Sequence, residues 1–130
     1  MITTIPGPSL ADFERASDVV ARVARRTPME SSQFLAELLG VPVHLKCENL
    51  QRTGSYKLRG AYHRIAALSD ADRARGVVAA SAGNHAQAVA YHGHRLGIPV
   101  TIVMPEPTPT IKVTQTEGHG AKVVLYGAMF

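Results

Sequence analysis

The stretch TGSYKLRG at residues 53–60 places a lysine, Lys57, in the first turn of a predicted helix. Ser55 is the expected N-cap, because a helical pattern starts directly after it and a serine oxygen can accept from the first free backbone N–H groups. A cation there faces the positive end of the helix dipole, which costs about 0.3 to 1 kcal/mol at an exposed site. Taken alone, Lys57 is more typical of solvated surface than of a reactive amine. Its unfavourable position needs a reason.

A second polar stretch joins a predicted strand to the next predicted helix, and it consists of Ser81, Ala82, Gly83, Asn84 and His85. In doubly wound sheets ligands bind at this end of a strand, because free N–H groups and the helix dipole favour an anion. Gly83 would let a ligand approach the backbone closely, and Ser81 and Asn84 add hydrogen-bonding side chains. The alternative is that Ser81 and Asn84 only cap the helix. The turn alone does not decide between these two interpretations.

Other candidate side chains carry weaker signals. His92 and His94 are two positions apart, so on a helix they face different ways, and solvated surface is the better interpretation than a shared metal. The GHG at 118–120 is typical of a helix stop, because a phosphate-binding G-x-G-x-x-G pattern is absent. Cys47 lies in a predicted strand and fits a structural thiol better than a nucleophile. We therefore expect no metal site.

The composition is that of a globular protein. Of the 130 residues 45% are hydrophobic and only 18% are charged, which predicts one compact unit rather than disorder. The net charge of +4 is scattered apart from Arg22, Arg25 and Arg26, so nucleic-acid binding has little support. A single cysteine, Cys47, fits a reducing compartment. The sequence has neither a long apolar run nor a typical signal peptide, so no membrane association and a cytoplasmic location are expected.

The elements that position these residues follow from hydrophobic periodicity. The pattern predicts an amphipathic helix with a capping box at Ser9 and Asp12. In chain order we expect helices at 9–25, 32–39, 56–66, 85–96 and 111–120, and strands at 41–47, 77–80, 99–105 and 121–126. The polar stretch SDADRARG at 69–76 is expected to be irregular. Strands that alternate with helices and are apolar throughout predict an α/β fold with a parallel sheet covered on both faces.

Two of these stretches together resemble a known family. TGSYKLRGA followed by VVAASAGNHAQAVA resembles the fold-type II pyridoxal-phosphate enzymes of the threonine dehydratase and serine racemase group. In that group S-(F/Y)-K-x-R-G-A carries the cofactor lysine, and S-x-G-N-H lines the cofactor. RTPM, LKCENLQ, LGIPVTIVMP and IKVTQTEGHGAKVVLYG agree, so the resemblance runs over residues 26–127. It implies a truncated α/β architecture like that of tryptophan synthase β. The alanine at position 82 of this motif is more like threonine dehydratase, since serine racemase more usually has a serine there.

The resemblance implies roles for individual residues. Lys57 would bind pyridoxal 5'-phosphate covalently and remove the α-proton of the substrate, and both roles need a neutral amine. The helix dipole disfavours the ammonium form, which gives the unusual position of Lys57 a reason. Asn84 would hydrogen-bond the 3'-oxygen of the cofactor, and Tyr56 would pack near its ring. The turn formed by Ser81, Ala82, Gly83, Asn84 and His85 would hold the substrate carboxylate.

The implied activity is the conversion of L-threonine to 2-oxobutanoate and ammonia by a carbon–nitrogen lyase. Such an enzyme takes a small amino-acid substrate, serves amino-acid metabolism such as isoleucine biosynthesis, and would be a cytoplasmic homo-oligomer. The resemblance leaves two other enzymes open, serine racemase and serine dehydratase.

Members of the family are longer than this chain. The resemblance implies that residues 1–75 are the N-terminal part of the large domain, with the cofactor lysine, and that residues 76–130 are most of the small α/β domain. The glycine-rich loop for the cofactor phosphate and the partner of the pyridine nitrogen would lie in later sequence. We therefore expect the 130-residue chain alone to be a poor catalyst or none. An alternative of another class is a noncatalytic truncated protein that self-associates through its open sheet edge.

Overall fold

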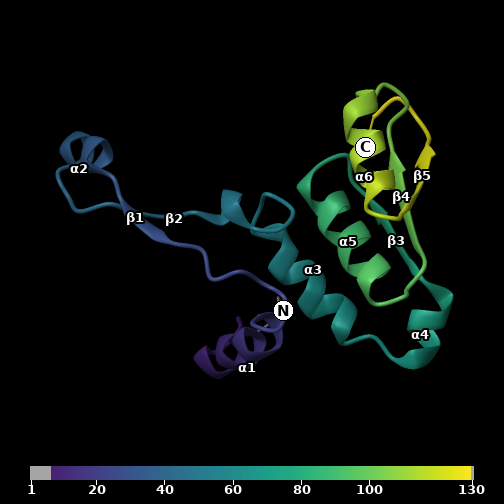
Figure 1. Cartoon of the computed structure of the whole chain (residues 1–130), viewed down its shortest axis with the longest axis horizontal. Coiled ribbons are helices and arrows are strands. Elements are labelled where there is room, and N and C mark those ends of the chain that lie inside the picture. The colour runs from purple at the N-terminus through teal and green to yellow at the C-terminus, as the bar shows by residue number, and fades with distance from the viewer. Residues whose placement is uncertain (1–6, 130) are drawn as a thin grey trace, which may run out of the picture.

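The structure is a computed structural model that describes residues 7–129. The N-terminal elements extend away from a compact C-terminal unit, in which helices pack on a parallel sheet (Figure 1). In chain order the elements are α1 (Leu10–Val20), β1 (Met29–Ser31), α2 (Gln33–Leu39), β2 (His44–Lys46), the short 3-10 helix η1 (Glu48–Leu50), α3 (Lys57–Ala66), α4 (Asp70–Arg75), β3 (Val77–Ala80), α5 (Asn84–Arg95), β4 (Val100–Met104), α6 (Thr110–Gly118) and β5 (Lys122–Leu125).

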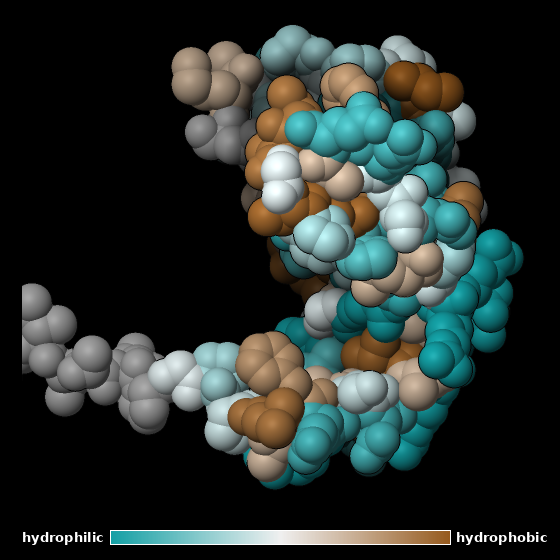
Figure 2. All heavy atoms as spheres, turned by 90° about the vertical axis from the view of Figure 1, so that its left-hand side faces the viewer, coloured by the Kyte–Doolittle hydropathy of each residue, from teal (hydrophilic) through white to brown (hydrophobic). Residues whose placement is uncertain are grey.

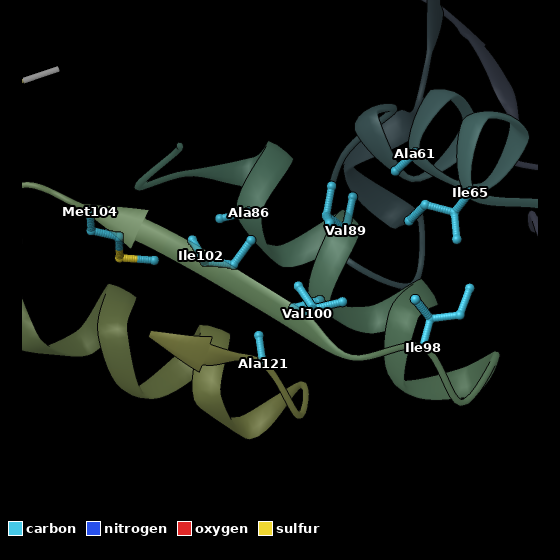
Figure 3. Close-up of a cluster of buried hydrophobic side chains, with 11 residues drawn as sticks. Ala61, Ile65, Ala86, Val89, Ile98, Val100, Ile102, Met104 and Ala121 are labelled. Carbon is cyan, nitrogen blue, oxygen red and sulfur yellow. The ribbon is translucent and has the colours of Figure 1, made fainter. Parts of the chain in front are cut away.

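The predicted parallel sheet is confirmed, with the strand order β3-β4-β5. Val77 pairs with Val100, and Ile102 pairs with Val123. The side chains of β4 alternate, so that Val100, Ile102 and Met104 are buried beneath α5. Figure 3 shows this core continuing from β4 through α5 to Ala61 and Ile65 of α3. The helix that begins at Lys57 is therefore anchored to the sheet through α5.

The expectation that helices cover both faces of this sheet is wrong for the described residues. Because β3, β4 and β5 follow one another across the sheet through right-handed crossovers, α5 and α6 fall on the same face. The two helices contact each other there, and both lie on one side of the strands in Figure 1. On the other face Val78 is 72% exposed.

Several local predictions hold and others need correction. The capping box at Ser9 and Asp12 is confirmed, but α1 ends at Val20 rather than at residue 25. The helix predicted at 32–39 is confirmed as α2, which Ser32 and Gly40 cap. Residues 70–75 form α4 instead of an irregular stretch, because the Ser69 side chain caps this polar segment. The expected strand at 41–47 is shorter, and it pairs antiparallel with β1, an element that hydrophobic periodicity did not indicate.

The outer surface of the N-terminal part carries unpartnered apolar side chains. Leu10 and Phe13 on α1 and Phe34 on α2 are all exposed, although they share the apolar faces of their helices. Brown apolar side chains are visible among the polar ones in Figure 2, where the outline is hollowed on one side. In contrast, α3 buries Leu58, Ala61 and Ile65, as its periodicity predicted.

Candidate active site

Lys57 is the first residue of α3, so its predicted place in the first helical turn is confirmed. The N-cap is Tyr56 rather than Ser55, because Tyr56 already has helical backbone angles. The Ser55 hydroxyl still accepts a hydrogen bond from the Lys57 N–H at 3.3 Å. The Lys57 Nζ lies 5.0 Å from the centroid of the Tyr56 ring. Among residues 7–129 no hydrogen bond or ion pair engages this exposed amine, which leaves it free for chemistry.

A carboxylate fixes the helix that carries Lys57. Glu48 accepts from Arg59 of α3 through two hydrogen bonds, each 2.8 Å long. The Thr27 hydroxyl donates to the same carboxylate at 2.6 Å. The hydrogen bonds from Arg59 lower the pKa of Glu48 most, and burial opposes them by raising it. With the further hydrogen bond from Thr27, the pKa of Glu48 falls to about 2. Glu48 therefore stays ionised and joins α3 to the segment around Thr27.

Gln51 and Lys46 extend this network to the backbone of residues 25–27. The Gln51 side chain donates to the Arg25 carbonyl at 2.7 Å and accepts from the Arg25 N–H at 3.1 Å. Lys46 Nζ donates to the Thr27 carbonyl at 2.6 Å. These supporting residues were not singled out from the sequence. Their signal was that RTPM and LKCENLQ accompany the lysine motif, and the structure shows that all three segments are in contact.

A cleft of about 770 Å³ opens beside the start of α3. Tyr56, Lys57 and His85 line it together, with apolar walls from Ile65 and Val89 and from β3. The cleft therefore combines a free primary amine, an aromatic ring and an imidazole with apolar side chains, and Arg64, Asp72 and Arg75 add charged groups to its lining. Such a combination suits a flat organic ligand that carries an electrophilic group.

The turn before α5 lines a second, more open hollow of about 460 Å³. Ser81, Ala82 and Gly83 contribute to it together with Lys112 of α6, a residue that the sequence reasoning missed. Gly83 is the N-cap of α5, and no side chain caps this end among the described residues. The interpretation that Ser81 and Asn84 merely cap the helix is therefore wrong. A helix N-terminus beside an amine favours an anionic group such as a carboxylate.

The predicted site residues thus fall into two neighbouring groups. Lys57, Tyr56 and His85 share the larger cleft, whereas 81–83 line the smaller hollow. Asn84 is exposed at the start of α5 and is not among the residues that line either one. The structure therefore places Lys57 and His85 on the same cleft and leaves the role of Asn84 as a prediction.

Two further observations concern the part of the chain that the structure describes, 7–129. Its His, Cys, Asp and Glu side chains form no group of three or more that could hold a metal ion. None of its helices combines the length and apolar character needed to cross a membrane.

The family model for pyridoxal-phosphate dependent enzymes matches residues 20–130. The chain belongs to this family. The L-threonine ammonia-lyase of Thermotoga maritima is 51% identical over 122 residues, which are 94% of this chain and 30% of that protein. The processed threonine deaminase isoform 2 of Solanum lycopersicum superposes with a TM-score of 0.81 at 41% identity, over 99% of this chain and 37% of the deaminase. Maize serine racemase gives a TM-score of 0.88 at 34% identity, over 96% and 38%.

Membership of the pyridoxal-phosphate family confirms the predicted resemblance and the α/β fold class. The chain spans 30% to 38% of the lengths of these three relatives. Enzymes of this family depend on pyridoxal phosphate. Their cofactor has an aldehyde, a flat ring and a phosphate, and the free amine of Lys57 in an apolar-walled cleft fits the first two of these groups.

Proposed function

We propose that the protein to which this chain belongs converts L-threonine to 2-oxobutanoate and ammonia, with Lys57 as the cofactor-binding and catalytic lysine. The observation that carries the proposal is the free amine of Lys57, held at the start of α3 and facing a cleft large enough for an organic cofactor. The 51% identity with an L-threonine ammonia-lyase supports the choice of reaction. Ala82 in the turn supports threonine over serine racemisation.

The chain's own groups supply attachment, orientation and proton transfer. When bound, pyridoxal phosphate supplies an aldehyde for the amine and a ring that accepts negative charge from the substrate α-carbon. Lys57 would hold the cofactor through its ε-amine, and the same amine, when not bonded to the cofactor, would accept the α-proton of the substrate. The hydrogen bonds that Arg59 donates to Glu48 and the packing of α3 on α5 keep Lys57 at the mouth of the cleft.

The remaining residues orient the cofactor and the substrate. Tyr56 packs beside the ring, as its position next to Lys57 in the cleft supports. Asn84 would hydrogen-bond the 3'-oxygen of the cofactor. The substrate carboxylate is held by the turn formed by Ser81, Ala82, Gly83, Asn84 and His85, where the first N–H groups of α5 point.

The wider context completes the proposal. Residues 1–75 belong to the large domain and 76–130 to the small α/β domain. The substrate is a small amino acid, and the enzyme is a cytoplasmic homo-oligomer that serves isoleucine biosynthesis. A second candidate activity is serine racemisation, which the superposition on maize serine racemase favours.

A trapping experiment tests the role of Lys57 directly. Incubation with pyridoxal phosphate followed by borohydride reduction should label Lys57, as peptide mapping by mass spectrometry would show. Lys57→Ala should remove this label and the long-wavelength absorbance of the lysine-bound cofactor. Lys122→Ala is the matched control, because Lys122 lies exposed on β5, outside the cleft. A label of equal strength in the Lys57 variant would refute the assignment.

The reaction is tested on the longest natural protein that contains this chain. L-threonine should yield 2-oxobutanoate and ammonia in equal amounts, and Lys57→Ala should abolish both. Formation of D-serine from L-serine without 2-oxobutanoate from threonine would move the protein to the racemase group.

A further inference from the structure

His92 is a titratable residue in the interior that the proposed chemistry does not use. It lies on α5, is 0% exposed, and was wrongly expected at the solvated surface, whereas His94 is indeed exposed. Its Nε2 lies 3.0 Å from the carbonyl oxygen of Leu58 on α3. The ring of Tyr62 packs against it from α3 at a centroid distance of 5.0 Å, and that of Tyr91 at 5.1 Å.

The hydrogen bond to Leu58 determines where the proton of His92 resides. A carbonyl oxygen can only accept, so Nε2 must carry the hydrogen. Nδ1 is buried and has no hydrogen-bond partner among the described residues. A second proton on Nδ1 would therefore leave a buried N–H donor unsatisfied. The geometry selects the neutral ring with its hydrogen on Nε2.

This contact joins the two helices that form the candidate site. Leu58 directly follows Lys57 and is itself fully buried. α5 begins at Asn84, and its His85 and Val89 line the same cleft as Lys57. Within residues 7–129, the bond from His92 is the only one involving a side chain that links α3 to α5. The core residues at this interface, such as Ala61 of α3 and Val89 of α5, make apolar contacts, which are less directional than a hydrogen bond.

We propose that His92 is a positioning residue: its neutral Nε2–H form fixes α5 against the first turn of α3, and protonation, which would bury a charge and an unsatisfied Nδ1–H, weakens the packing of the ring between the two helices. The position of the Lys57 amine relative to the 81–85 turn then depends on the protonation state of His92. The effect on catalysis through Lys57 rests on the proposed function, whereas the contact between His92 and Leu58 does not.

The surroundings of His92 act on its protonation in both directions, and burial is the largest effect. The titratable group that faces it from α3 is the phenol of Tyr62, and α5 adds Tyr91 and Arg95. His119 lies behind Tyr91, at a ring distance of 5.8 Å. No carboxylate in the described residues pairs with His92. Burial lowers the pKa of His92 below 6.5, the Leu58 carbonyl acts in the opposite direction, and the charge of Arg95 lowers it further.

The sign of the pH dependence follows. Because the folded pKa is depressed, the unfolded chain binds the proton more tightly. The contribution of His92 is fully present above pH 6.5 and is lost as the pH falls toward the folded pKa. Between these two pKa values, protonation of His92 in the unfolded chain should raise the unfolding equilibrium constant about tenfold for each unit by which the pH falls.

Three variants separate this role from simple packing. His92→Gln keeps a donor near the Nε2 position but cannot titrate, and His92→Leu removes the donor while keeping an apolar side chain. His94→Gln is the matched control, because His94 is exposed on the same helix. Urea unfolding at pH 7.5 and 5.5, at constant ionic strength, should show the histidine-dependent loss of stability in the wild type and His94→Gln but not in His92→Gln. Amide exchange in α3 should be about tenfold or more faster in His92→Leu, with Gln restoring much of the protection.

A measurement on the unmodified chain covers the case in which His92→Leu fails to fold. Nitrogen-15 NMR of the histidine rings should show His92 as the neutral tautomer with hydrogen on Nε2, titrating only below pH 6.5. A hydrogen on Nδ1, titration at or above pH 6.5, or equal pH dependence in the wild type and His92→Gln would overturn the proposal. No readout requires pyridoxal phosphate. A failed trapping at Lys57 would thus contradict the proposed function and leave the His92 contact standing.

Discussion

Replacing Glu48 with glutamine should loosen the helix that carries Lys57. Glutamine keeps the size of the side chain but replaces the charged carboxylate that accepts two hydrogen bonds from Arg59 and one from Thr27. The Glu48 side chain is only 15% exposed, whereas that of Arg59 is 36% exposed. The pair is therefore partly shielded from solvent, and its loss should be measurable, unlike that of a typical surface ion pair.

The size of the effect follows from the pKa of Glu48. Folding lowers this pKa from 4.5 to about 2. At about 1.4 kcal/mol per pH unit, this interval corresponds to roughly 3 to 4 kcal/mol. The exposure of Arg59 allows solvent screening, so we expect Glu48→Gln to lower the free energy of unfolding at pH 7 by about 1.5 to 3 kcal/mol.

The pH dependence gives the prediction its sign. Because the folded pKa is depressed, the stabilisation is fully present above pH 4.5 and is lost as the pH falls through about 2. The stability gap between wild type and Glu48→Gln should therefore be widest near neutral pH and should narrow steadily below pH 4.5. Urea unfolding followed by circular dichroism at pH 7, 5, 4 and 3 measures this gap.

The control for this experiment is Glu14→Gln, because Glu14 is exposed on α1. That variant should stay within about 0.5 kcal/mol of the wild type at pH 7, as most surface substitutions do. A Glu48→Gln loss below about 0.5 kcal/mol, or a gap that does not change between pH 7 and pH 3, would show that the carboxylate does not hold α3.

Two further substitutions test the packing and the helix start. Gly93→Ala should lower the free energy of unfolding by about 1 to 3 kcal/mol, because its Cβ would clash with Val100 Cγ2. Gly118→Ala is the control: a Cβ there would meet nothing within 4 Å, so the loss in the same urea assay should be less than about 0.5 kcal/mol. Equal losses in the two variants would contradict the close packing of α5 on β4. Ser9→Ala should destabilise α1 by about 0.5 to 2 kcal/mol, because it removes the side chain that accepts from the Asp12 N–H. The loss should be seen as faster amide exchange within α1. Unchanged exchange would show that the capping box does not stabilise α1.

The local elements were readable from the sequence because their causes lie within a few residues. The Ser9 and Asp12 capping box spans one helical turn, and the buried stripe of α3 repeats at helical spacing. Gly40 ends α2 with a φ of 70°, a conformation that glycine adopts without strain. The lysine motif and the S-x-G-N-H turn were recognisable for the same reason, since each is a short continuous stretch.

The partners of these elements were not readable, because they are far apart in the chain. Thr27 and Glu48 are separated by 21 positions, and Leu58 and His92 by 34. The spacing of His92 and His94 indicated surface for both, yet the packing of α5 on α3 buries one of them completely. Periodicity describes which residues share a face of a helix but not which face a neighbouring element covers.

The sequence alone therefore determined the elements, the family resemblance and the position of the lysine, because local hydrogen bonding and side-chain spacing are properties of short segments. The tertiary structure decided which charges and rings meet around that lysine. The pairing of Glu48 with Arg59, the cleft shared by Lys57 and His85, and the buried bond from His92 all depend on elements packed together from distant parts of the chain. Their energies arise from removing side chains from water, which happens only when those elements come into contact.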